Sequence, residues 1–181
     1  RVLYGGAEYC PFCAAERWGL AVALSRFGTF KDLGQTTSAG GDEYAPDTAT
    51  LSFHGTTYTS KYIVFDGYEL QSNKLDASGN YAALDSMPSS DEAILNKYDY
   101  PPYVSSKGAI PFIDFGGKVV SQGTAYDPML LAGMTHLEIA KAASDPTSKA
   151  GKAILGTANL ISAEICKLTD GQPAGVCSSA G

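Results

Sequence analysis

Apolar and polar positions along the first third of the chain predict a strand, a helix and further strands. Val2–Tyr4 is an uninterrupted apolar run of the kind that forms a short buried strand. Apolar side chains then recur at helical spacing from Cys13 to Phe27 without a proline, and Gly28 offers a stop for that helix. Aromatic and β-branched residues over 50–69 indicate short strands, after a loop-like stretch at 36–49.

The second half of the chain carries the clearest turn and capping signals. Residues 110–115 and 118–121 are strand-like, and Gly116 and Gly117 between them predict a β-hairpin with a two-residue turn, because glycine tolerates positive φ. Capping boxes and Asp-Pro pairs predict helix starts at residues 89–92, 127–128, 135–138 and 145–146. The C-terminal third is therefore expected to be helical.

Length and composition favour one compact unit. A chain of 181 residues with 44% hydrophobic content can bury one ordinary core, so we expect a single domain over residues 1–181. No run reaches the roughly 18 apolar residues of a membrane-spanning helix. The chain opens at Arg1 and enters a strand at once, so we expect a preceding signal peptide or membrane anchor to have been removed.

The charge of the chain argues against one class of partner. The formal net charge is −6, whereas nucleic-acid binding requires clustered Lys and Arg to displace counterions. Nucleic acid is therefore not expected as a partner. Charged residues make up 18% of the chain and Gly, Ser and Thr are abundant, which suits an exported surface.

The candidate chemistry lies in the motif Cys10-Pro11-Phe12-Cys13, at the start of the first predicted helix. Free backbone N–H groups and the positive helix end stabilise a thiolate at this position, so Cys10 is expected to be the exposed, ionised nucleophile. Cys13, one turn inward, would resolve the mixed disulfide that Cys10 forms with a partner. Pro11 suits an early helical position, where its missing N–H costs nothing. From spacing alone, half a zinc site and an inert bridge remain as alternatives.

Two segments resemble a known superfamily. Residues 8–13, EYCPFC, resemble the active-site segment of glutaredoxins and bacterial disulfide oxidoreductases, and residues 109–112, AIPF, resemble their cis-proline loop. The order of strand, motif-bearing helix, late Ile-Pro hairpin and terminal helix is that of the thioredoxin superfamily. The longer run GAEYCPFCAAERWGLAVALSRFGTF also resembles a bacterial thioredoxin-like family catalogued as a domain of unknown function, over most of the chain.

The resemblance implies a fold and a set of roles. The fold would be α/β and thioredoxin-like, a central mixed sheet flanked by helices, with an insertion over residues 36–105 before the hairpin and a helical C-terminus. Pro111 would be cis and lie against Cys10, as part of the catalytic site. Pro11, Phe12 and Ile110 would contact an extended protein substrate. No cofactor or metal is implied.

A second pair of cysteines lies near the C-terminus. Cys166 falls at the end of the last predicted helix and Cys177 follows a loop, so we expect a structural disulfide. Such bridges persist in oxidising compartments, which favours an extracytoplasmic location. Four cysteines allow three pairings, and the sequence leaves open a relay between the pairs. A four-cysteine zinc site is the competing interpretation, although this second pair lacks the close spacing of a zinc knuckle.

Other titratable residues offer weaker candidates. His54 and His136 could serve a cysteine nucleophile, as in a thiol protease, but both lie in predicted turns and are expected at the surface. Glu8, Glu16 and Arg17 flank the motif and could tune thiol ionisation or relay protons. For Arg17 we expect a solvated side chain, and for Glu8 the role stays open.

Two functions from different classes follow from the sequence. The first is an extracytoplasmic thiol-disulfide oxidoreductase that acts on protein thiols and disulfides, with a membrane redox partner as a further candidate. The second is a cell-surface structural or interaction protein that keeps the fold without redox turnover. The direction of electron flow depends on the reduction potential, which the two residues between the cysteines influence without fixing it.

Overall fold

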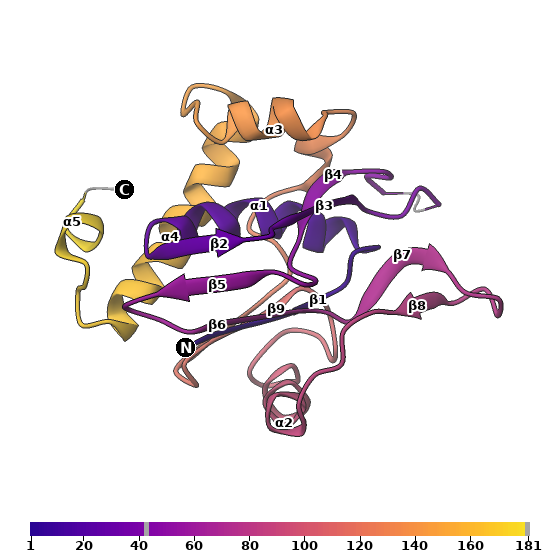
Figure 1. Cartoon of the computed structure of the whole chain (residues 1–181), viewed down its shortest axis with the longest axis horizontal. Coiled ribbons are helices and arrows are strands. Elements are labelled where there is room, and N and C mark those ends of the chain that lie inside the picture. Colours follow the sequence, from indigo (N-terminus) through magenta and orange to yellow (C-terminus); the bar gives the residue numbers. More distant parts are fainter. Residues whose placement is uncertain (42–43, 180–181) are drawn as a thin grey trace.

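The centre of the protein is a mixed four-stranded sheet (Figure 1). The computed structural model describes residues 1–41 and 44–179. The strands stand in the order β10-β9-β1-β6 and comprise β1 (Val2–Gly6), β6 (Phe65–Glu69), β9 (Phe112–Phe115) and β10 (Val119–Gln122). β1 pairs with β6 in parallel and with β9 antiparallel, so the expected α/β class with a mixed sheet is confirmed.

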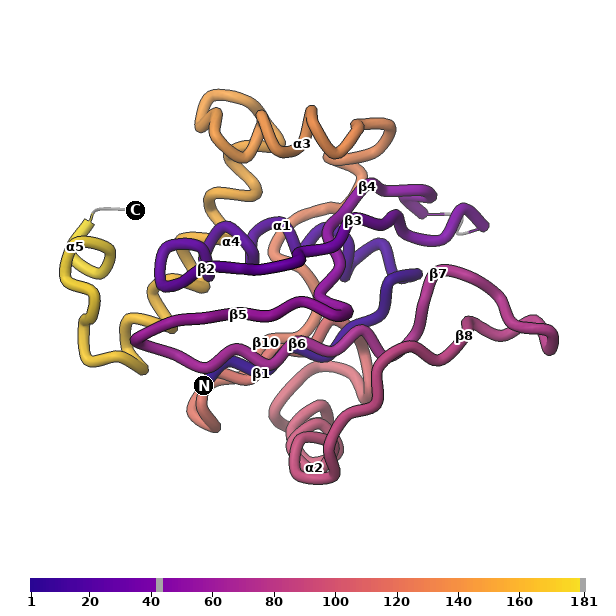
Figure 2. The backbone as a smooth tube through the Cα atoms, viewed as in Figure 1, coloured from indigo at the N-terminus to yellow at the C-terminus, as the bar shows by residue number. Residues whose placement is uncertain are grey.

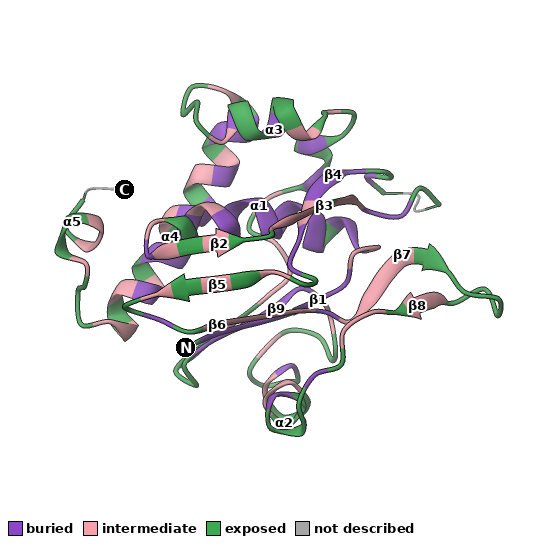
Figure 3. Cartoon of the chain, in the orientation of Figure 1, coloured by how far each residue is buried: buried purple, intermediate pink, exposed green. Residues whose placement is uncertain are grey.

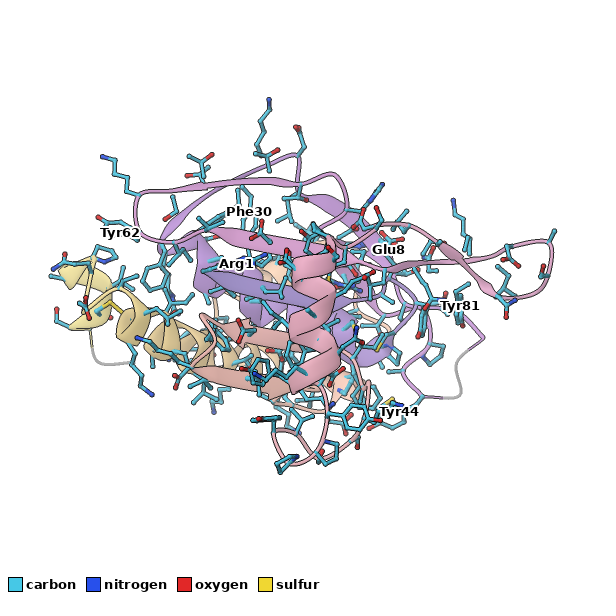
Figure 4. The ribbon with its side chains drawn as sticks, turned by 90° about the horizontal axis from the view of Figure 1, so that it is seen from below. Arg1, Glu8, Phe30, Tyr44, Tyr62 and Tyr81 are labelled. Atoms are coloured by element: carbon cyan, nitrogen blue, oxygen red, sulfur yellow. A yellow bond between two sulfur atoms is a disulfide. The ribbon has the colours of Figure 1, made fainter. Side chains whose placement is uncertain are left out.

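Helices cover both faces of this sheet. Val2 and Tyr4 point to the face that α1 (Pro11–Ser25) and α4 (Lys149–Leu168) cover. Both side chains pack with buried residues of these two helices in one hydrophobic core. On the opposite face Gly5 meets α2 (Ser89–Tyr98), which lies in front of the strands in Figure 4. The alternation of side chains along a strand thus divides the helices between two layers. Burial is deepest along β1, β9 and α1 (Figure 3).

The segment between α1 and the hairpin forms three small two-stranded sheets, which Figure 2 traces around the end and side of the central sheet. They pair β2 (Gly28–Lys31) with β5 (Thr57–Ser60), β3 (Gly34–Thr37) with β4 (Ala49–Ser52), and β7 (Gln71–Leu75) with β8 (Tyr81–Ala83). An aromatic cluster of Phe30, Phe53, Tyr58 and Phe65 joins this segment to the main core. The short strands expected over 50–69 are present as β4, β5 and β6. The loop expected over 36–49 is wrong at its start, because β3 extends to Thr37.

Helix starts follow the predicted signals at some positions and not at others. The capping box at Thr135 and Glu138 is confirmed and begins α3 (His136–Ala142). The box predicted at 89–92 is wrong, because the backbone of Pro88 caps α2 and no side chain caps it. Two further elements complete the chain: the 3-10 helix η1 (Pro128–Leu131), which begins as predicted, and α5 (Ala174–Cys177).

Three other boundaries differ from the sequence prediction. Helix α1 ends at Ser25, and Gly28 instead begins β2, where any side chain would collide with Tyr58 and the carbonyl of Thr59. Ser148 rather than Asp145 caps α4. The hairpin itself is confirmed, but three residues separate the paired positions Phe115 and Val119, and both of its glycines have positive φ.

The expected disulfide between Cys166 and Cys177 is present, with a Cα–Cα distance of 5.6 Å. It ties α5 to the end of α4 and takes both cysteines out of any zinc site. Replacing both cysteines by serine should lower the free energy of unfolding by roughly 3 kcal/mol, because the unfolded chain loses a closed loop. Urea denaturation under non-reducing conditions measures this difference. A change below about 0.5 kcal/mol would show that the bridge does not support the fold.

Candidate active site around Cys10 and Cys13

The two cysteines of the motif lie at the amino end of α1, as predicted. Strand β1 ends at Gly6, a short turn follows, and Cys10 is the N-cap residue in an extended conformation, with Pro11 at the helix start. The sulfur of Cys10 accepts a hydrogen bond from the backbone N–H of Cys13 at 3.3 Å. A helix start places unsatisfied N–H groups around this sulfur, which favours its negative charge.

Burial separates the roles of the two thiols, and neither is in a disulfide. Cys10 exposes 6% of its surface and Cys13 none, so Cys10 is more enclosed than the sequence led us to expect. A hydrogen bond from the Cys13 thiol is the largest cause that lowers the pKa of Cys10, and backbone N–H groups and the charge of Arg17 add to it. Burial raises the pKa of Cys13 well above its ordinary value. The thiolate is therefore favoured on Cys10.

The loop before the β9–β10 hairpin lies beside the motif, although it is far from the motif in the sequence. The Ile110–Pro111 peptide bond is cis, as the resemblance implied. The sulfur of Cys10 lies 3.8 Å from the carbonyl oxygen of Ile110, to which it donates while it carries its proton. The N–H of Gly123 donates to the carbonyl oxygen of Pro111 at 2.8 Å, which continues the hairpin ladder up to this loop. Residues that are 100 positions apart thus share one site.

Arg17 is buried beneath the site, so the expectation of a solvated side chain is wrong. Its Nη1 lies 2.6 Å from Oε2 of Glu69 on β6, and both side chains are fully enclosed. The same guanidinium donates to the carbonyl oxygens of Ala7 and Glu8, at 3.2 and 3.4 Å, in the turn before Cys10. A buried guanidinium requires such partners, because unpaired charge in the interior is costly. Arg17 therefore ties the turn to the sheet.

Glu69 and Tyr4 complete the polar interior behind Cys13. Burial raises the pKa of Glu69 to about 7, against the opposing charge of Arg17. The hydroxyl of Tyr4 is enclosed without a hydrogen-bond partner among the described residues. It lies so close to Gly6 that any side chain at residue 6 would collide with it. Sequence reasoning did not identify Glu69, because its partner Arg17 is 52 residues away in the chain.

Aromatic pairs from the inserted segment flank the motif on both sides. Tyr9 stacks on Tyr81 of β8 with ring centroids 4.1 Å apart, and Phe12 stacks on Tyr44 at 5.7 Å. The labelled side chains Tyr44 and Tyr81 lie toward the same end of the molecule as Glu8 (Figure 4). The inserted segment therefore builds the surroundings of the cysteines, which the sequence did not indicate.

A surface hollow of about 480 Å³ opens beside Phe12. Tyr44 and Tyr126 line it together with Pro128. The hydroxyl of Tyr44 donates to Asp127 at 2.6 Å, and the hydroxyl of Tyr126 donates to the carbonyl oxygen at residue 15 in α1, also at 2.6 Å. Of the residues expected to contact substrate, Phe12 lines this hollow with 41% of its surface exposed. Pro11 is buried at the helix start.

Glu16 on α1 is a second buried acid besides Glu69, with 3% of its surface exposed. Its Oε2 accepts from the N–H of Ala125 at 3.4 Å, and burial raises its pKa from 4.5 to about 7. An acid whose pKa is raised by folding holds its proton more tightly in the folded state. The free energy of unfolding therefore includes a favourable contribution from the proton on Glu16 at low pH. This contribution is lost as pH rises from about 4.5 to about 7 and Glu16 ionises.

Glu16→Gln should reduce this pH dependence. The fall in the free energy of unfolding between pH 5 and pH 8 should become smaller by roughly 2 to 3 kcal/mol. Urea denaturation at both pH values measures it, with the exposed Glu92→Gln as the matched control. Equal falls in wild type and Glu16→Gln would contradict a buried, protonated Glu16.

Neither histidine hydrogen-bonds a motif cysteine in the part of the chain that the structure describes. Nδ1 of His54 pairs with Asp85 at 2.6 Å, and that imidazole is half exposed, as expected. His136 is less exposed than expected, because its Nε2 lies 2.8 and 3.0 Å from the carbonyl oxygens of Thr36 and Thr50. Among residues 1–41 and 44–179, no three acidic, His or Cys side chains form a group that could hold a metal ion.

These features define the class of the protein: a mixed α/β chain with a free dithiol at a helix start, facing a cis-proline loop. Residues 1–167 match the family described as "Domain of unknown function (DUF929)", and the chain belongs to that family. Comparison with curated proteins and with solved structures found no match. Within the described ranges, every helix is too short or too polar to cross a membrane.

Proposed function

We propose that this protein is an extracytoplasmic thiol-disulfide oxidoreductase with a thioredoxin-like fold. The observation that carries the proposal is the difference between the two thiols. The Cys10 pKa is lowered at a helix start, while the Cys13 thiol is held neutral in the interior. Exchange requires one ionised attacking sulfur and a second one that acts later.

The reaction runs in two balanced steps. The Cys10 thiolate attacks one sulfur of a substrate disulfide, so that a mixed disulfide forms and the substrate's other sulfur leaves as a thiolate. The Cys13 thiol then passes its proton to the released substrate thiolate or to water and attacks the Cys10 sulfur, which forms the Cys10–Cys13 disulfide and releases the second substrate thiolate. Substrate is reduced and the motif oxidised by two electrons. The reverse sequence oxidises a substrate dithiol.

The surroundings of the motif support a protein substrate. Phe12 presents an exposed ring next to Cys10, and the carbonyl of Ile110, which precedes the cis bond to Pro111, lies beside the sulfur. An extended polypeptide could pair with such backbone groups while an apolar side chain enters the hollow beside Phe12. The Cys166–Cys177 bridge supports an oxidising location, outside the cytoplasm. A thiol or disulfide of an exported or membrane-bound protein is the proposed partner, and no cofactor enters the reaction.

Insulin reduction and refolding of a reduced, scrambled protein test the proposal. Wild type should accelerate at least one of them, and Cys10→Ser should return the rate to the uncatalysed value. The Cys166→Ser/Cys177→Ser variant serves as the matched control and should keep its activity at temperatures where it is folded. Catalysis by Cys10→Ser, or none by wild type, would reject the oxidoreductase.

A second function is favoured by the low exposure of Cys10, which leaves 6% of its surface open. An enclosed sulfur suits a cell-surface structural or interaction protein that keeps the fold without redox turnover. The two proposals differ in thiol reactivity. A Cys10 that reacts with a small alkylating agent no faster than an unfolded-chain cysteine at pH 6 favours the structural protein, and a faster reaction favours the enzyme.

A further inference from the structure

A second cavity of about 420 Å³ lies between α4 and the edge strand β10. Its floor is apolar, because Ile113 and Phe115 on β9 and Ile161 on α4 are each buried in the core and line it. Its rim is mixed: Val119 and Leu160 line it with 41% and 65% of their surfaces exposed, beside the polar side chains of Ser121 and Gln122. This volume falls in the range of small-molecule sites, roughly 300 to 1,000 Å³.

The polar end of this cavity is formed by the carboxyl group of Glu16. That side chain lines the cavity although 3% of its surface is exposed. Among the described residues it hydrogen-bonds the N–H of Ala125 at 3.4 Å and the hydroxyl of Thr124, and no Lys, Arg or His pairs with it. Carboxylates in the interior are normally paired with a cation or with several short hydrogen bonds. Glu16 therefore has acceptor capacity that the chain leaves unused.

Both charged side chains among the described residues that line the cavity are acidic. Glu164 also lines it, and Lys167 reaches Glu164 at 2.7 Å without lining the cavity itself. No lysine or arginine is among the lining residues in the part of the chain that the structure describes. Lys167 compensates Glu164, so Glu16 is the acid at which an anionic ligand would be repelled and which a cation would complement.

We propose that the cavity between α4 and β10 binds a small organic cation, a primary amine on an apolar alkyl or aryl body. The ammonium group would donate to the carboxylate of Glu16, and the hydrocarbon part would cover Ile113, Phe115 and Ile161. The apolar part gains by leaving water, and the charged pair fixes its orientation. This site differs from the hollow beside Phe12 and does not depend on the redox proposal.

Binding is tested at pH 8, where Glu16 with a pKa of about 7 is ionised, by NMR titration of the full-length protein with hexylamine, and with hexanol and hexanoate as probes of equal chain length. Hexylamine should bind most tightly, with the largest shifts at β10 and α4. Glu16→Gln should weaken hexylamine at least about tenfold and leave hexanol unchanged, since it removes the charge and keeps the shape. Glu92→Gln, an exposed acid on α2, is the matched control and should leave every affinity unchanged.

A second variant blocks the cavity without altering its charge. Ala163 is exposed on α4 and lines the cavity, so Ala163→Trp should fill it, keep the fold and abolish hexylamine binding. Three results would each overturn the proposal: hexanol binding as tightly as hexylamine, undiminished hexylamine binding by Glu16→Gln, or undiminished binding by folded Ala163→Trp. None of these measurements involves thiol chemistry, so failure here leaves the oxidoreductase proposal intact.

Discussion

Cys13→Ser is expected to stop the exchange reaction halfway and to accumulate a covalent adduct between Cys10 and the substrate. The Cys10 thiolate still attacks, but no second sulfur is present to release the product. Turnover should fall by at least about a thousandfold, because the resolving nucleophile is lost. Intact mass spectrometry after incubation with a disulfide-bonded peptide should show one peptide bound per chain.

The matched control is Cys10→Ser, which retains the buried Cys13. Because Cys13 exposes none of its surface, this variant should form no adduct over the same period. Treatment with dithiothreitol should release the peptide from Cys13→Ser and restore its original mass. Adduct formation by Cys10→Ser at the rate of Cys13→Ser would reverse the assigned roles.

Arg17→Met is expected to destabilise the protein by about 3 to 5 kcal/mol, because it leaves Glu69 buried without its counter-charge. The Nη1–Oε2 contact is 2.6 Å and both side chains are fully enclosed, so water cannot replace the lost partner. The turn at Ala7 and Glu8 also loses its hydrogen bonds to the guanidinium. Urea denaturation at pH 8 measures the effect, since Glu69 has a pKa of about 7.

The double variant Arg17→Met/Glu69→Met separates the charge effect from packing. Two apolar side chains of similar size should recover most of the lost stability, as is found for other buried ion pairs. The same variants test the electrostatic role of Arg17 at the site. Both should slow alkylation of Cys10 near neutral pH, because the charge of Arg17 lowers the Cys10 pKa. An Arg17→Met single variant as stable as wild type would contradict the buried pair.

Local signals in the sequence were sufficient for the helix start at Cys10, the hairpin and the terminal disulfide. Each depends on residues close together in the chain: a proline at the first helical position, two adjacent glycines, or two cysteines 11 residues apart. The cis bond before Pro111 required the resemblance, because spacing alone favours a trans proline.

Long-range contacts decided what the sequence could not predict. Arg17 follows the motif by one turn and resembles a surface residue, until folding brings Glu69 from β6 beside it. The predicted capping box at 89–92 fails because Ser89 is already the first helical residue and Pro88 occupies the N-cap position, where it has no side-chain acceptor to offer. The aromatic partners of the motif likewise come from β8 and from the loop before β4. Ion pairs and ring stacking between residues far apart in the chain produce no periodic pattern in the sequence.

Cys10 and Cys13 are expected to interconvert reversibly between dithiol and disulfide within the folded protein. Equilibration of the native chain in glutathione buffers of graded potential, followed by alkylation and peptide mass spectrometry, measures this directly. We expect a single two-electron transition of the Cys10–Cys13 pair, while Cys166–Cys177 stays bonded throughout. A Cys10–Cys13 disulfide that never forms, or that opens only when the protein unfolds, would contradict it.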